Sequence, residues 1–396
     1  MLHIVMPIDR SISPVLTPGI KKKVNGGNGM LSWKKLGILP VLALGLGIGL
    51  AAPVAAQKTL KMQASWPASL TQYENFVMFA KRIEQLTAGK IKIETMPAGT
   101  VVPPFEVLDA TQKGVIDGAH TWTGYWVGKN KAAILFSGGP GGPFGMDHLD
   151  YLSWYWWGGG QQLHEKFLKE TLKLDVVSIP VLNASPQALG WFKKKIESLA
   201  DFKGQKCRQT GIAAEIYNEM GMRTVNMPGG EIMPAAERGT IDCAEWVGGI
   251  EDLQFGFQTI WKYHYAPSLH EPVSFGELLV NGKVWRDLGP ENQELFKAVS
   301  TETLFRWWSR WQKQNADALK EFREKHKVNI EHTPDEILED FLKAWDKVAE
   351  REAAKNPVFK EIYDSQKAFA SISVPAKLFY YPSYGLAAKH YWGEKK

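Results

Sequence analysis

Cysteine is scarce in this chain of 396 residues, which contains only Cys207 and Cys243. Two cysteines cannot build a disulfide framework, and neither belongs to a C-x-x-C pair. A small disulfide-rich domain, a zinc ribbon and a thioredoxin-like redox site are therefore excluded. The 44% of hydrophobic residues, with 16 tryptophans among them, instead favour a folded core.

An excess of charge of one sign is missing from most of the chain. The formal net charge is +5, but residues 1–56 hold six basic residues against Asp9 alone. The remaining residues contain 41 basic and 41 acidic side chains. The body of the protein therefore has no net charge that would attract nucleic acid or an anionic membrane.

The motifs of common enzyme classes are absent as well. The sequence contains no G-x-x-x-x-G-K-[ST] and no G-x-S-x-G, and His164-Glu165 is not followed by a histidine at the H-E-x-x-H spacing. These absences favour a protein that binds its ligand without turning it over. An exported hydrolase stays open as an alternative, because a pair of catalytic carboxylates leaves no motif.

One long apolar run lies near the N-terminus, from Leu36 to Ala56, directly after a pair of lysines. The run ends in small residues, as a signal peptidase requires, so we expect an export signal cleaved after Ala56, with Met30 as an alternative start of translation. An uncleaved anchor of this length stays open. Since no second run reaches 18 apolar residues, residues 57–396 are expected to be soluble and periplasmic.

An internal repeat is the strongest architectural signal. Residues 106–119 and 231–244 both fit E-[VI]-[LM]-x-A-x-x-[KR]-G-x-I-D-x-A, at an offset of 125. Each copy predicts an amphipathic helix that ends at a left-handed glycine, Gly114 or Gly239, with a short strand starting directly after it. The repeat therefore predicts two similar α/β lobes with mainly parallel sheets.

The rest of the chain is assigned around this repeat. A helical pattern from Glu291 to about His326 is long enough to run along both lobes, and a further helix follows Thr333 as its N-cap. The expected parts are a first lobe at 57–183, a second lobe at 184–272, a return strand with the long helices at 273–356, and an aromatic tail at 357–396.

Ligands of parallel α/β sheets gather at the carboxyl ends of the strands. The residues that follow the two repeated strands are therefore candidates for a cleft between the lobes: His120, Trp122, Tyr125, Glu245 and Trp246. Arg208 lies on another short strand, and its planar guanidinium matches a carboxylate. Taken singly, each of these residues has a plainer explanation. Arg208 could lie on the surface, the tryptophans could belong to the core, and Glu245 could be a solvated side chain.

Together these segments resemble the substrate-binding proteins of the tripartite ATP-independent periplasmic (TRAP) transporters. An export signal, the strand Lys203-Gly204-Gln205-Lys206-Cys207-Arg208 and a helix ending in G-x-[IV]-D match the pattern from Leu60 to about Asn281. Three segments are similar to the branch that binds 2-oxo or 2-hydroxy monocarboxylates: Ser185-Pro186-Gln187, Gly239 to Trp246, and His270-Glu271-Pro272.

The resemblance implies a fold, a partner and roles for residues. The fold would be that of a two-lobed, hinge-linked periplasmic-binding protein of type II, which delivers an acid such as pyruvate or lactate to the subunits of a TRAP membrane permease. Arg208 would grip the carboxylate, and Gln187, Glu245 and the Trp246 carbonyl would hold a bridging Na⁺ or Ca²⁺. The implied substrate-binding residues are Arg208, Gln187, Tyr125, Trp246 and Glu271.

Three further expectations complete the sequence reading. Cys207 and Cys243 are expected to be buried thiols, because neighbouring parallel strands seldom present disulfide geometry. The aromatic tail predicts a homodimer or packing on its own lobes, and both stay open. A sugar receptor is the second binding function, because tryptophans stack on sugar faces.

Overall fold

The computed structural model describes residues 57–184 and 186–393, and the predicted export signal lies outside them. In these ranges the strands form two six-stranded sheets. The first sheet has the order β2-β1-β3-β11-β4, with β5 also paired to β11: β1 (Lys58–Ala64), β2 (Ile91–Met96), β3 (Gly118–Trp122), β4 (Gly138–Gly139), β5 (Val176–Asn183) and β11 (Val273–Asn281). The second sheet has the order β12-β10-β6-β9-β7-β8: β6 (Gly190–Phe192), β7 (Lys206–Arg208), β8 (Arg223–Val225), β9 (Cys243–Ala244), β10 (Tyr263–Ala266) and β12 (Asn329–His332).

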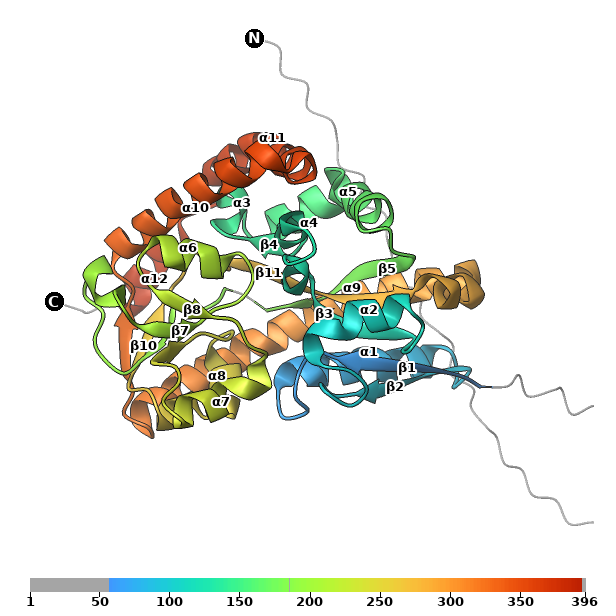
Figure 1. Ribbon diagram of the computed structural model, residues 1–396, viewed down its shortest axis with the longest axis horizontal. Coiled ribbons are helices and arrows are strands. Elements are labelled where there is room, and N and C mark those ends of the chain that lie inside the picture. The colour runs from blue at the N-terminus through green and yellow to red at the C-terminus, as the bar shows by residue number, and fades with distance from the viewer. Residues whose placement is uncertain (1–56, 185, 394–396) are drawn as a thin grey trace, which may run out of the picture. The chain divides into compact units, whose positions relative to one another are not determined.

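The α-helices of the described residues lie between and around these strands (Figure 1). They are α1 (Thr71–Leu86), α2 (Val107–Gln112), α3 (Gly142–Gly145), α4 (His148–Trp157), α5 (Gly160–Lys166), α6 (Ala213–Glu219), α7 (Gly229–Glu237), α8 (Gly249–Phe255), α9 (Gly282–Glu324), α10 (Asp335–Lys355), α11 (Pro357–Tyr380) and α12 (Tyr384–Trp392). Throughout these ranges, no helix is both long enough and apolar enough to cross a membrane.

Both sheets are mixed, so the expectation of mainly parallel sheets is wrong. β1 pairs in parallel with β2 and β3, whereas β11 runs antiparallel to β3, β4 and β5. In the second sheet β7 is parallel to β8 and β9, but β6 is antiparallel to β9 and β10. Only the strands joined by the repeated helices are bound by the crossover rule. β11 joins the first sheet after the chain has crossed the second one, so the rule does not fix its direction.

The internal repeat has a common structural cause in its two copies. Gly114 and Gly239 adopt φ values of 70° and 69°, as predicted for helix-ending glycines. The repeated aspartates, Asp117 and Asp242, then accept the backbone N–H of Lys61 and of Lys206, at 2.7 and 3.0 Å. Each aspartate thus fixes its own loop to the neighbouring parallel strand. The strands that follow begin at Gly118 and Cys243, three residues later than predicted, because these loops come first.

The predicted long helix is α9, which contacts elements of both sheets. It packs on β5 and α1 on the side of the first sheet and on α8 and β12 on the side of the second, and Figure 1 shows it extending from β5 to α8. A kink at Gly289-Pro290 separates the first seven residues of α9, which the sequence pattern missed, from the rest of the helix. The next helix, α10, has Pro334 as its N-cap, and Thr333 donates its hydroxyl to the Pro267 carbonyl instead.

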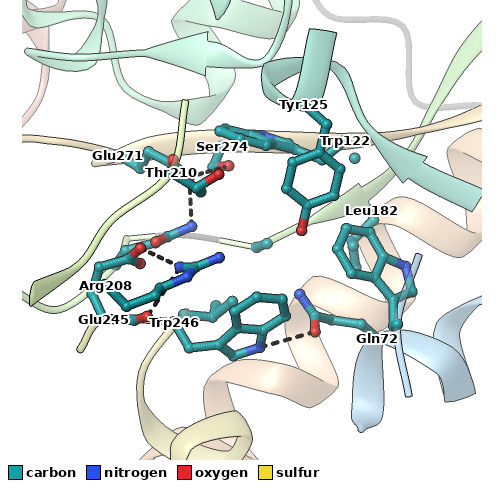
Figure 2. Close-up of a pocket in the computed structure, with 15 residues that line it drawn as sticks. Gln72, Trp122, Tyr125, Leu182, Arg208, Thr210, Glu245, Trp246, Glu271 and Ser274 are labelled. Atoms are coloured by element: carbon teal, nitrogen blue, oxygen red, sulfur yellow. Dashed lines mark hydrogen bonds and ion pairs between the residues drawn. The ribbon is translucent and has the colours of Figure 1, made fainter. Parts of the chain in front are cut away.

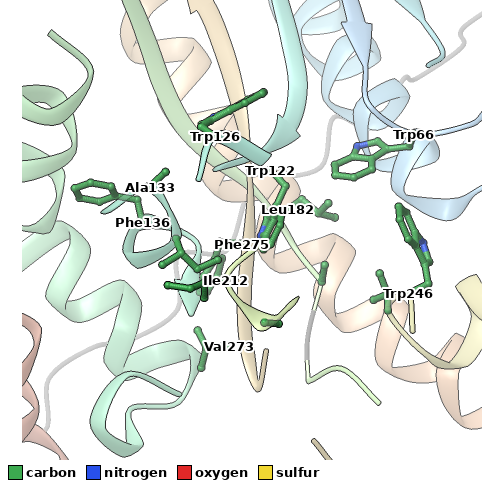
Figure 3. Packing of buried hydrophobic residues seen from close by; sticks show 14 of the residues in the cluster. Trp66, Trp122, Trp126, Ala133, Phe136, Leu182, Ile212, Trp246, Val273 and Phe275 are labelled. Atoms are coloured by element: carbon green, nitrogen blue, oxygen red, sulfur yellow. The ribbon is translucent and has the colours of Figure 1, made fainter. Parts of the chain in front are cut away.

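The core joins apolar residues from both sheets, and Figure 3 shows the part of it around Trp122 and Phe275. Many of the tryptophans are buried in it, including Trp191, Trp307 and Trp311. Indoles that fill the core are not free to stack on a sugar.

Cys207 and Cys243 form a disulfide, so the expectation of two free thiols is wrong. The two residues are direct partners in the parallel register of β7 and β9. Their Cα atoms lie 4.5 Å apart, within the range that a disulfide spans. The bridge joins the strand that ends in Arg208 to the strand that precedes Glu245.

Candidate ligand-binding site

A small cavity lies where segments of the two sheets meet (Figure 2). Its volume, counted as the space open to the centres of water molecules, is about 30 Å³. All the substrate- and cation-binding residues that the family resemblance implies line it, together with others: Trp66, Gln72, Trp122, Tyr125, Leu182, Ala184, Gln187, Arg208, Thr210, Glu245, Trp246, Val247, Glu271, Ser274 and Gly276. Larger hollows, of about 840 Å³ beside α5 and β5 and about 620 Å³ between α1 and α9, contain none of the predicted residues.

Arg208 is the last residue of β7 and is 1% exposed. Its Nε donates to the Met227 carbonyl at 3.2 Å, and its Nη1 donates to the carbonyl of Glu245 at 3.1 Å and to the Glu245 carboxylate. The guanidinium also lies 5.0 Å from the centre of the Trp246 ring. Among the described residues, Nη2 is buried and has no hydrogen-bond partner. The arginine is thus held on one side, and one N–H group is left for an acceptor.

Glu245 follows β9 and faces both Arg208 and a histidine. Its second carboxylate oxygen lies 3.7 Å from Nε2 of His270. Nδ1 of the same ring lies 2.5 Å from the Ser268 hydroxyl. Because the carboxylate is 3% exposed, its charge is stabilised mainly by the guanidinium.

Gln187 and Glu271 form the next layer. Gln187 donates its side-chain N–H to Glu271 at 2.6 Å, and the Ser274 hydroxyl donates to the same carboxylate oxygen at 2.8 Å. The amide oxygen of Gln187 lies 3.3 Å from Nε2 of His270. Burial raises the pKa of Glu271 to about 7, so this carboxyl is only partly ionised near neutral pH.

The oxygen atoms of this wall fit a hard cation better than a transition metal. No group of three or more His, Cys, Asp or Glu side chains is placed to hold a metal within the described ranges. Amide and carboxylate oxygens, supplied by Gln187 and Glu245, are instead the ligand types that Na⁺ and Ca²⁺ accept. Both side chains line the cavity and lie next to the same His270 ring.

The other walls are aromatic and come from both sheets. Trp246 donates its indole N–H to Gln72 at 3.2 Å, and Trp66 donates its own to Nδ1 of His120 at 2.6 Å. The ring of Tyr125 lies 5.3 Å from that of Trp122 and 6.1 Å from that of Trp66. Burial raises the pKa of Tyr125, so its phenol stays protonated and can donate a hydrogen bond.

The cleft prediction is wrong for His120, which supports a wall without lining the cavity. Its ring lies between the indole of Trp66 and the Asn75 amide, and burial lowers the pKa of His120 to about 3, so the ring is neutral. Trp126, the residue after Tyr125, is buried away from the cavity and donates to Glu277 at 3.1 Å.

Trp66 and Gln72 were missed by sequence reasoning. Trp66 follows β1, so the rule that selected residues after β3 would have found it, had β1 been included. Gln72 lies in the first turn of α1 and carries no such signal.

The chain belongs to the bacterial extracellular solute-binding proteins of family 7 (DctP), whose model matches residues 62–356. These are receptors that bind a solute, which agrees with the absence of enzyme motifs. A curated relative, the monocarboxylate 2-oxoacid-binding periplasmic protein of Nostoc sp. (strain PCC 7120), is 33% identical over 309 residues, which cover 78% of this chain and 83% of the relative.

Solved structures of TRAP solute-binding proteins are similar along most of the chain. One from Bordetella bronchiseptica, a dimer with calcium and picolinate in one of its sites, is 30% identical with a TM-score of 0.78 and covers 85% of this chain and 97% of its own. One from Pseudoalteromonas atlantica with sodium and pyruvate is 26% identical, with a TM-score of 0.76 and coverage of 85% and 99%. One from Colwellia psychrerythraea with calcium and pyruvate is 27% identical, with a TM-score of 0.76 and coverage of 85% and 100%. The resemblance to TRAP receptors and the predicted two-lobed fold are confirmed.

Proposed function

We propose that this protein is the extracytoplasmic receptor of a TRAP transporter for a small 2-oxo or 2-hydroxy monocarboxylate such as pyruvate or lactate. The observation that carries the proposal is the buried, unpartnered Nη2 of Arg208 in a cavity that Glu245 also lines. A carboxylate is the acceptor that matches this guanidinium in charge and shape. The 2-oxoacid-binding relative and the two pyruvate-bound structures support the same class of ligand.

A cation bound with the acid follows from the charges of the site. Arg208 and Glu245 cancel each other, so the negative charge of a bound acid would be buried without compensation. Na⁺ or Ca²⁺ on the oxygens of Gln187, Glu245 and the Trp246 carbonyl would bridge to the acid and neutralise it. Sodium or calcium accompanies the ligand in each of the three structures named above.

Calorimetric titration of ligand-free protein tests this function against the alternatives. Pyruvate and lactate should bind in the presence of Na⁺ or Ca²⁺. Glucose, which lacks the carboxylate, and propionate, which lacks the oxygen on C2, should bind weakly or not at all. The ligand should be recovered unchanged. Binding of glucose without binding of pyruvate would instead support a sugar receptor, and turnover of an ester or glycoside would support a hydrolase.

The proposed receptor works by hinge closure and transfer. Lobes at 57–183 and 184–272, joined by the segments at 273–356, would close on the acid and present it to the permease subunits. Export would follow from a signal cleaved after Ala56.

A homodimer through the C-terminal tail is the second part of the proposal. α11 packs on its own chain through Phe359, Ile362 and Ala370, but α12 has no buried residue. Its Tyr391 and Trp392 are 69% and 88% exposed. An apolar helix left in solvent is unfavourable, and a second copy of the chain is the occupant that covers such a helix symmetrically. Light scattering should give a dimer for residues 57–396 and a monomer after truncation at 381. A monomer in both would refute the dimer.

A further inference from the structure

The relatives described above hold acids of different size, pyruvate in two structures and picolinate in a third. The residues that bind the carboxylate and the cation do not determine how large the side chain of the acid can be. A different residue of this protein has to limit that size. A cavity needs roughly 10–15 Å³, measured in the same way, to hold a single water molecule. The cavity of about 30 Å³ therefore accepts only a few atoms before a wall has to move.

Most walls of the cavity are held by hydrogen bonds. Arg208 and Glu245 hold each other, Trp246 is held by Gln72, and Trp66 is held by His120. The indole N–H of Trp122, in contrast, is buried without a partner among the described residues. Trp122 is therefore a wall held by packing alone, and its replacement breaks no hydrogen bond of the indole.

Two glycines set the position of the Trp122 ring. Gly124, in the turn Thr123–Trp126 directly after β3, lies so close to the ring that any Cβ there would overlap it. Gly211, three residues after Arg208, approaches the same end of the ring, and a Cβ there would come within 3.1 Å of the ring and 3.6 Å of the Gly124 carbonyl oxygen. Trp122 belongs to the first sheet and Gly211 follows a strand of the second. The contact between them thus joins the two halves of the binding site.

We propose that Trp122 is the specificity-determining wall of the cavity, and that its contact with Gly211 limits the bound acid to a short side chain. The inference rests on the proposed function. With a short acid the ring keeps its place and the contact is retained. A longer side chain would displace the ring toward the Gly211 segment, which has no room to receive it, and the closed form would be lost.

The test compares pyruvate with 4-methyl-2-oxopentanoate, which has the same carboxylate and 2-oxo group and a branched side chain. Calorimetry of the wild type should show a preference for pyruvate. Trp122→Leu should reduce this preference by at least about tenfold, mainly through tighter binding of the longer acid, since a single methylene in an apolar pocket already changes discrimination by roughly 10-fold or more. The matched control is Trp157→Leu, the same exchange at a tryptophan that is 86% exposed, and it should keep the wild-type preference.

A second pair of variants tests the contact itself. Gly211→Ala should weaken binding of both acids, because its methyl group meets the indole and because the φ of 62° at Gly211 strains an alanine. Adding Trp122→Leu should restore the part of the loss that is due to the indole. Should Trp122→Leu fail to fold, Trp122→Phe removes less of the wall and should shift the preference in the same direction.

The proposal is overturned if folded Trp122 variants bind pyruvate with the wild-type preference. That result would leave the receptor function intact. If the wild type binds neither 2-oxo acid, the proposed function itself fails and this inference falls with it.

Discussion

Replacing Arg208 with lysine removes the guanidinium fork while it keeps the positive charge. A lysine has one ammonium group, so it cannot reproduce the three donors that contact Met227 and Glu245 and still present an N–H group to a ligand. Truncating one partner of a buried, hydrogen-bonded charge pair costs about 2–5 kcal/mol. Since lysine retains the charge, we expect the lower part of this range, about 2–3 kcal/mol, which weakens binding roughly 30- to 150-fold.

The assay is calorimetric titration with pyruvate at fixed Na⁺ and Ca²⁺ concentrations, after the melting temperature has shown that the variant is folded. Arg286→Lys is the matched control, because Arg286 is 62% exposed and pairs with Asp175 outside the site. The control should bind as the wild type does, since exposed ion pairs contribute little. A folded Arg208→Lys variant with wild-type affinity would refute the assignment of the carboxylate to Arg208.

Three further changes test the cation, a buried carboxyl and the disulfide. Glu245→Gln should weaken binding of the acid, and added Na⁺ or Ca²⁺ should restore part of it; wild-type binding that survives exhaustive chelation in Na⁺-free buffer would contradict the bridging cation. Burial raises the pKa of Glu251, which accepts from Thr71, from 4.5 to about 8, so its contribution to stability is full below about pH 4.5 and is lost as the pH rises to about 8. Glu251→Gln should therefore flatten the fall of the melting temperature across that window, and an unchanged slope would exclude Glu251 as its source. Replacing Cys207 and Cys243 with alanine should lower the free energy of unfolding by up to about 4 kcal/mol, from the entropy of a loop closed over a sequence separation of 36; a denaturant midpoint equal to that of the wild type would contradict a stabilising bridge.

The candidate site was predictable where it depends on strand ends. The repeat located β3 and β9, and the rule for parallel sheets then selected Trp122, Tyr125, Glu245 and Trp246 beside them. His120 is selected by the same rule but lies two residues before the end of β3, where its ring packs against Trp66 and Phe76 instead of lining the cavity. Without the exact end of the strand, the sequence could not tell which of these residues reaches the cavity.

The parts that depend on long-range pairing were not predictable from the local pattern. The antiparallel insertion of β11 brings Glu271 and Ser274 to the cavity, and nothing in the local sequence fixes the direction of that strand. The disulfide depends on the register of β7 against β9, which places Cys207 directly opposite Cys243. A shift by one residue would have turned one sulfur to the other face of the sheet.

Native mass spectrometry of protein purified without added ligand tests the central claim most directly. If the buried arginine and glutamate bind an acid and a cation, a fraction of the purified protein should still contain both. The account predicts that the folded chain carries the mass of a 2-oxo or 2-hydroxy monocarboxylic acid together with Na⁺ or Ca²⁺, and that Arg208→Lys carries neither acid nor cation. A retained sugar or other uncharged solute in the wild type, or the same retained mass in Arg208→Lys, would contradict it.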